Sequence, residues 1–144
     1  MSKTEFDRRL KHLVAEQETL LGRKNEVDER WNNGVFERFK DPVLTAAHTP
    51  LFWRYDLDRK RNPHLLERLA VNAVFNPGAI EIDGMVYLVC RVEGGDRKSF
   101  FAVAESKSGT GRFRFWDRPA CSTTCRTRRR TPCVHAAAWS NAWR

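Results

Sequence analysis

Three cationic side chains stand close together in the middle of the sequence, beside acids and an amide that could bind a ligand with them. Arg91 lies at the end of an otherwise apolar run, and Arg97 and Lys98 follow soon after it. Arginine grips phosphate with two parallel hydrogen bonds and lysine binds it as a point charge, so the cluster would suit an anion, phosphate above all. An arginine–glutamate pair that closes the end of a sheet would explain Arg91 equally well. The candidate ligand site comprises Asn76, Arg91, Asp96, Arg97 and Lys98.

A β-hairpin is expected to position this cluster. The dipeptide Asp83-Gly84 lies between two β-rich runs, Ala79–Ile82 and Met85–Val92, which is the pattern of a two-residue turn. With these two residues as the loop, the ladder predicts Asn76 opposite Arg91, with their Cβ atoms roughly 5 Å apart. A bulge at the proline that follows Asn76 would change this register.

Two more strands are expected after the hairpin, over Ser99–Ala104 and Phe113–Trp116. Glycine-rich turns at 94–96 and 108–111 separate them. Four successive short strands with tight turns form a meander, the unit of a propeller blade. A sandwich or a small barrel could begin in the same way.

The first residues predict an amphipathic helix over 4–22, with Thr4 as its N-cap, Asp7 as the acidic half of a capping box and Gly22 as its stop. The stretch 23–72 has no clear period but is rich in aromatic side chains. Such side chains either stack on pyranose rings in a sugar site or belong to the core. They are Trp31, Phe36, Phe39, Phe52, Trp53 and Tyr55.

The net charge of +8 is concentrated at the C-terminal end. Residues 118–144 contain arginine but no lysine and no acid, which leaves the first 117 residues with a net charge of only +2. The composition therefore predicts three segments: an N-terminal helix over 1–24, a β-rich body over 25–118, and a basic, disordered tail over 119–144. The sequence has no apolar run of about 20 residues and no apolar signal core near its start, which predicts a cytoplasmic protein without a membrane span.

The tail suggests two further functions, and we expect neither. Its three cysteines and one histidine are zinc-ligand types, but the closing Cys-x-His pair is too tight for a standard finger, so no metal is predicted. The arginine cluster with two tryptophans could bind nucleic acid weakly, and no specific nucleic-acid partner is predicted. The residues concerned are Cys121, Cys125, Cys133, His135, Arg126–Arg130, Trp139 and Trp143.

Several long motifs resemble the mannoside phosphorylases, glycoside hydrolase family 130. Asn76-Pro-Gly-Ala79, Cys90-Arg-Val-Glu-Gly-Gly-Asp-Arg-Lys-Ser99 and Ala102-Val-Ala-Glu-Ser106 resemble the first-blade signature of the family. Arg23-Lys-Asn-Glu26 and the stretch Pro42–Asp56 are similar to its mannosyl-glucose phosphorylase branch. The resemblance extends from about Glu5 to Pro119.

The resemblance implies a mainly β fold, in which an N-terminal α-helix precedes the first blade of an incomplete five-bladed β-propeller. It implies an enzyme that uses inorganic phosphate as co-substrate and no cofactor to convert mannosyl-β-1,4-glucose into α-mannose 1-phosphate and glucose, with inversion. The positions of Asn76 and Arg91 would hold the sugar, that of Arg97 phosphate or sugar, and His48 could contact the acceptor sugar. A β-mannoside hydrolase or a mannan-oligosaccharide phosphorylase of the same family is the alternative. The resemblance leaves open whether a full-length relative is homo-oligomeric.

The sequence departs from the family after Pro119. The family's catalytic aspartate lies in an Asn-x-Tyr-Asp-x-Arg segment, which has no match here, so no catalytic residue is assigned. The tail has the composition of GC-rich DNA read out of frame, and one choice of codons for Cys125–Thr131 reads Leu-Pro-Asp-Pro-Glu-Thr-Asn one base earlier. Propeller blades take roughly 40–50 residues each, so we expect an N-terminal fragment with a frameshifted tail. We expect it to be inactive, because the segment with the catalytic aspartate is missing. We also expect it to be poorly soluble, because a single blade exposes strand edges and an apolar face.

Overall fold

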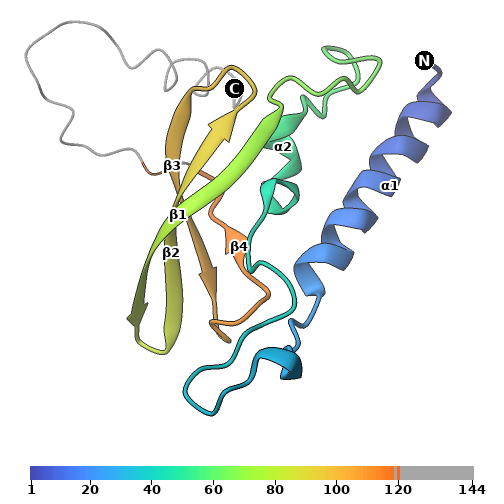
Figure 1. Cartoon of the computed structure of the whole chain (residues 1–144). Coiled ribbons are helices and arrows are strands. Elements are labelled where there is room, and N and C mark those ends of the chain that lie inside the picture. Colours follow the sequence, from blue (N-terminus) through green and yellow to red (C-terminus); the bar gives the residue numbers. More distant parts are fainter. Residues whose placement is uncertain (119, 121–144) are drawn as a thin grey trace, which may run out of the picture.

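The computed structural model describes residues 1–118 and residue 120, and it is mainly β with one long helix at the N-terminus, as predicted (Figure 1). The expectations for the tail, including both its zinc and its nucleic-acid hypotheses, lie outside the described residues. No helix in the described part of the chain is long and apolar enough to cross a lipid bilayer. The elements are α1 (Lys3–Gly22), the 3-10 turns η1 (Glu29–Trp31) and η2 (Ala46–His48), α2 (Leu51–Arg54), and the strands β1 (Val71–Ile82), β2 (Met85–Gly94), β3 (Ser99–Ser106) and β4 (Arg114–Phe115).

The four strands form one antiparallel sheet in the order β1-β2-β3-β4, so the predicted meander is confirmed. Asp83 and Gly84 connect β1 to β2, with φ angles of 51° and 73°. Both values are positive, as a type I′ hairpin turn requires. The predicted register is also confirmed next to this turn, where Ile82 pairs with Met85 and Gly78 with Val89.

The register changes between Phe75 and Gly78, and Phe75 rather than Asn76 lies opposite Arg91. The predicted pairing of Asn76 with Arg91 is therefore wrong by one residue. The two residues between Phe75 and Gly78 face a single residue of β2, which is a β-bulge. Asn76 takes a left-handed φ of 50°, and the proline after it has no N–H to give to the ladder. The bulge therefore shifts every pair beyond it.

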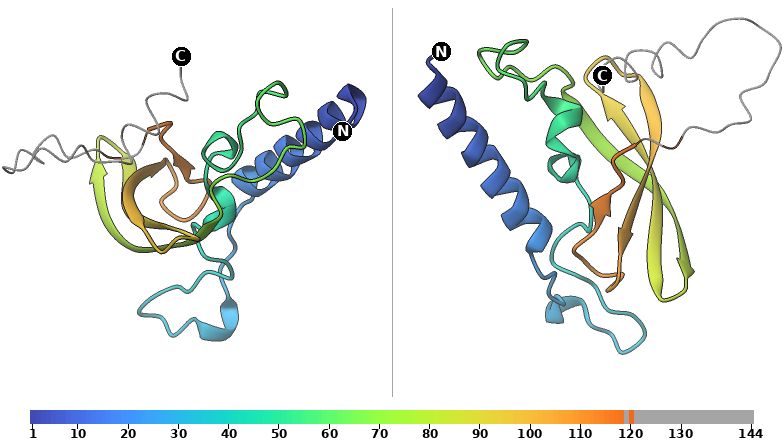
Figure 2. Two further views of the ribbon diagram at one scale, coloured as in Figure 1. Left: turned by 90° about the horizontal axis from the view of Figure 1, so that it is seen from above. Right: turned by 180° about the vertical axis from the view of Figure 1, so that it is seen from behind.

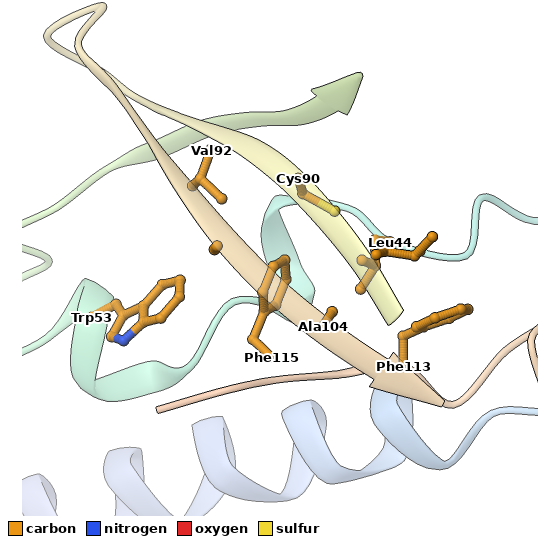
Figure 3. Close-up of a cluster of buried hydrophobic side chains, with 9 residues drawn as sticks. Leu44, Trp53, Cys90, Val92, Ala104, Phe113 and Phe115 are labelled. Atoms are coloured by element: carbon orange, nitrogen blue, oxygen red, sulfur yellow. The ribbon is translucent and has the colours of Figure 1, made fainter. Parts of the chain in front are cut away.

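One face of the sheet carries the hydrophobic core (Figure 3). Trp53 from α2 is fully buried against this face, and its indole Nε1 donates a hydrogen bond to the backbone oxygen of Asp117 at 3.0 Å. Burial also raises the pKa of the Cys90 thiol, which makes it an inert core side chain. Each large side chain buried in this way contributes about 1.5–3 kcal/mol. The core residues are Leu44, Trp53, Leu88, Cys90, Val92, Ala102, Ala104, Phe113 and Phe115.

Helix α1 lies beyond α2 from most of the sheet (Figure 2), and it reaches the sheet where Glu18 pairs with Arg114 of β4 at 2.8 Å. It ends at Gly22 as predicted, but its N-cap is Ser2, whose Oγ accepts a hydrogen bond from the Glu5 N–H at 3.1 Å. The predicted cap at Thr4 is wrong because Thr4 already lies within the helix. Of the helix residues only Phe6 and Leu21 are buried. Few apolar contacts therefore hold α1 to the rest of the structure.

Candidate functional site

Arg91 lies near the end of β2, on the sheet face opposite the core, and three neighbours hold its side chain. Its guanidinium carbon is 4.6 Å from the centre of the Phe75 ring. Its Nε donates a hydrogen bond to Ser99 Oγ at 3.0 Å, and one terminal nitrogen is 3.6 Å from a carboxylate oxygen of Glu93. The side chain is still 43% exposed. Arg91 is thus oriented by its neighbours and accessible to a ligand.

Glu93 is the carboxylate that joins the cluster. Its side chain is only 12% exposed, and its Oε1 accepts hydrogen bonds from Asn72 Nδ2 at 3.0 Å and from Arg97 at 3.1 Å. These two hydrogen bonds, Asn72 first and Arg97 second, hold the pKa of Glu93 below its ordinary value of 4.5. The Arg97 and Arg91 charges act in the same direction. Glu93 is therefore ionised at neutral pH and cannot act as a general acid.

The turn between β2 and β3 carries the remaining predicted site residues. The Lys98 N–H donates to Asp96 Oδ1 at 3.1 Å, and Lys98 Nζ lies 3.7 Å from Asp96 Oδ2. Gly94 begins this turn, and its N–H donates a hydrogen bond to the backbone oxygen of Lys98 at 2.9 Å. The side chains of Asp96, Arg97 and Lys98 are all exposed. Four of the predicted residues, Arg91, Asp96, Arg97 and Lys98, therefore belong to one end of the β2–β3 hairpin.

Asn76 lies on the neighbouring strand, in the bulge beside Phe75. Its side chain is exposed, and it does not form the predicted cross-strand pair with Arg91. Phe75 is the residue paired with Arg91, and Asn76 is its neighbour in the sequence, so Asn76 lies at the border of the cluster. Its predicted role in holding a sugar remains a prediction.

His48 belongs to a different part of the fold. It is buried in η2, where its Nδ1 accepts a hydrogen bond from the Thr45 N–H at 3.0 Å and lies 2.9 Å from Thr45 Oγ1. Burial is the main reason that the pKa of His48 lies below its ordinary value of 6.5, and the nearby charge of Arg23 lowers it further. These contacts give His48 a structural role at the start of its turn. The predicted contact with an acceptor sugar remains a prediction.

The aromatic side chains of residues 23–72 do not gather into one sugar platform. Trp53 is fully buried in the core, and Phe52 packs against the core. Trp31, the last residue of η1, and Phe36, on the irregular loop that follows, are each 58% exposed. The core interpretation therefore holds for Trp53 and Phe52.

Sequence reasoning missed the residues that hold Arg91 in place. Phe75 and Ser99 were not assigned to the site, and neither was Asn72. The Pro-Gly pair after Asn76 was the only available signal, since proline and glycine within a strand indicate a bulge. A bulge there moves Phe75 opposite Arg91, but the direction of the shift cannot be read from the residues alone.

The cluster combines three cations with two carboxylates, so it keeps one excess positive charge. A half-exposed arginine beside a second arginine and a lysine can bind an oxyanion or a polyol. Both carboxylates of the cluster are paired with cations, and the Ser99 hydroxyl accepts a hydrogen bond from Arg91. The chemistry of the cluster is therefore binding and charge stabilisation, while a proton donor would have to come from elsewhere.

Comparison with known proteins identifies the family of the chain. No family model matches the chain. Over 114 residues, which make up 79% of the chain, it is 56% identical to the 4-O-beta-D-mannosyl-D-glucose phosphorylase of Bacteroides fragilis. The chain spans 29% of the length of that relative. Because the identity is this high over most of its residues, the chain belongs to the mannoside phosphorylase family.

Proposed function

We propose that this chain carries part of the mannoside- and phosphate-binding site of a mannosyl-glucose phosphorylase. The complete enzyme would transfer the mannosyl group of mannosyl-β-1,4-glucose to inorganic phosphate, giving α-mannose 1-phosphate and glucose with inversion. The observation that carries the proposal is the 56% identity to a relative named for this activity. The basic cluster around Arg91 supports it, because the reaction needs a site for an anion.

The composition of the cluster fits phosphorolysis. Phosphate is already a good nucleophile at neutral pH, so the site needs cations that hold it in line rather than a carboxylate that activates water. Arg97 and Lys98 are exposed and would bind phosphate, Asn76 would hold the mannosyl ring, and Arg91 would bind both. An ordinary inverting glycosidase would need two carboxylates, one as acid and one as base. No organic cofactor or metal is part of the proposal.

The proton donor is proposed to be missing from the present sequence. Glu93 and Asp96 are ion-paired in the cluster, and residues 118–144 contain no acid. We infer that a shifted reading frame replaces the segment with the catalytic aspartate. The chain as it stands would then bind ligands of the enzyme without turning them over. The five-bladed propeller belongs to this proposal for the complete enzyme.

Resequencing the gene across codons 110–150, followed by an assay of the encoded protein, tests the proposal. We expect a single inserted or deleted base whose correction restores an Asn-x-Tyr-Asp segment. The corrected protein should release glucose from mannosyl-glucose only when phosphate is present, and the present chain should release none. Glucose release without phosphate would favour the β-mannoside hydrolase instead. No release from the corrected protein with either mannosyl-glucose or mannan oligosaccharides would refute the proposed activity.

A further inference from the structure

A row of three side chains crosses the sheet at Arg91. Phe75 of β1 lies on one side of Arg91 and Phe101 of β3 on the other, as the paired residues of neighbouring strands. Residues paired in this way point to the same face of the sheet. The bulge at Asn76 produces this arrangement, because an unbroken ladder would bring Asn76 to the position of Phe75.

The two phenylalanines of the row relate differently to the guanidinium. Its carbon lies 4.6 Å from the Phe75 ring centre, within the range in which a cation is attracted by an aromatic face. Among the described residues no such stacking joins Arg91 to Phe101, whose side chain is 57% exposed. Phe75 is therefore the ring that supports Arg91.

Arg91 uses some of its N–H donors in contacts with neighbouring residues, and others remain for a ligand. Stacking on Phe75 uses a face of the guanidinium, Nε donates to Ser99, and Nη2 faces Glu93. Nη1 donates none of the hydrogen bonds that Arg91 makes with the described residues. Arginine recognises phosphate through such pre-oriented N–H groups, and a support that fixes the plane reduces the entropy lost on binding.

We propose that Phe75 is a positioning residue for Arg91: its ring, together with the Ser99 hydroxyl, fixes the guanidinium so that Nη1 is presented to the oxygen atoms of a phosphate or a phosphorylated sugar. The inference rests on the proposed function for the class of ligand. Its structural part, the orientation of Arg91 by Phe75, stands independently of that function. The bulge makes this possible, because it places the aromatic side chain of Phe75, rather than the polar side chain of Asn76, opposite Arg91.

The test uses NMR of the full chain with 15N-labelled arginine, together with a titration by inorganic phosphate. Phe75→Leu removes the ring, Phe75→Tyr keeps it, and Phe101→Leu is the matched control on the other side of Arg91. The Arg91 Nε–H signal is identified by its loss in Arg91→Lys. In the unmodified chain, in Phe75→Tyr and in Phe101→Leu, we expect the ring to shift the Arg91 Nε–H resonance and its exchange with water to be slow. In Phe75→Leu we expect the ring-induced shift to disappear and the exchange to become faster. An Arg91 signal that is the same in Phe75→Leu as in the unmodified chain overturns the inference.

Phosphate binding separates this inference from the proposed function. We expect Phe75→Leu to weaken phosphate binding about two- to fivefold, the strength of one exposed cation–π contact, while Phe75→Tyr binds as the unmodified chain does. No phosphate binding by the unmodified chain would count against the proposed function, and the arginine spectrum would still decide the orientation. If Phe75→Leu does not fold, Ser99→Ala provides the second variant. Faster exchange of the Arg91 Nε–H in Ser99→Ala supports the inference, and unchanged exchange overturns it.

Discussion

Glu93 determines how much positive charge the basic cluster offers at a given pH. Its carboxylate faces both Arg91 and Arg97 and also accepts a hydrogen bond from Asn72. All these contacts favour the ionised form, which is why its pKa lies below 4.5. In the unfolded chain these contacts are lost and the ordinary value applies. Folding and ionisation of Glu93 therefore favour each other.

Replacing Glu93 by Gln should make the stability of the chain less sensitive to acid. A carboxyl whose pKa is lowered by folding stabilises the protein fully above its unfolded pKa, and this contribution is lost as pH falls through the lower, folded value. The difference in free energy of unfolding between the unmodified chain and Glu93→Gln should thus be largest near neutral pH and shrink below about pH 4.5. Urea unfolding at a series of pH values measures it. Glu81→Gln, at an exposed position of β1, is the control, and a difference that does not vary with pH would contradict the role assigned to Glu93.

At the scale of elements, the hairpin and the meander could be predicted because local residue types decide them. Asp83-Gly84 suits the two left-handed positions of its turn. The run Met85–Val92 is apolar at nearly every position, so its core face is known only from the alternating burial in the structure. The helix cap was harder, because Ser2 and Thr4 are both good caps and the choice depends on where the chain leaves the helix. The candidate site was likewise predictable only where local residue types determine it. Its charges could be found from the sequence, whereas its supports, Phe75 and Ser99, depend on the bulge and on pairing between strands.

The left-handed backbone at Asn76 gives the bulge a testable sequence requirement. Asparagine and glycine visit this conformation readily, whereas it costs other residues roughly 1–2 kcal/mol, and β-branched ones most. Asn76→Gly should keep the stability within about 0.5 kcal/mol, and Asn76→Val should lower it by about 1–2 kcal/mol. Denaturant unfolding compares the two variants. Ala79→Val, at an exposed position of the same strand with ordinary backbone, is the control, and an Asn76→Val chain as stable as this control would show that the bulge does not require the left-handed residue.

At the scale of the whole molecule, the sheet is covered on one face only. Trp53 and Leu44 cover the core face, while the opposite face leaves large apolar side chains open to solvent in the part of the chain that the structure describes. Contiguous apolar surface of this kind is unusual on a soluble monomer. Strand β1 is at the sheet's edge and is the longest of the four, which adds unpaired backbone groups. The exposed residues of this face are Ile80, Ile82, Val89, Phe101 and Trp116.

The chain should therefore associate with itself through this open face. Ile80 lies on the edge strand and is 56% exposed, so a lysine there places a charge in the contact without disturbing the core. Burial of an isoleucine is worth roughly 1.5–3 kcal/mol, so Ile80→Lys should weaken association about tenfold or more. Val35→Lys is the matched control, because Val35 is 87% exposed on the loop between η1 and η2. Sedimentation velocity over a range of concentrations should show the mass of the unmodified chain and of Val35→Lys rising with concentration, and that of Ile80→Lys rising much less. A monomer at every concentration, with a sharp cooperative melt, would mean that the open face needs no cover and that this part of the family's fold is stable by itself.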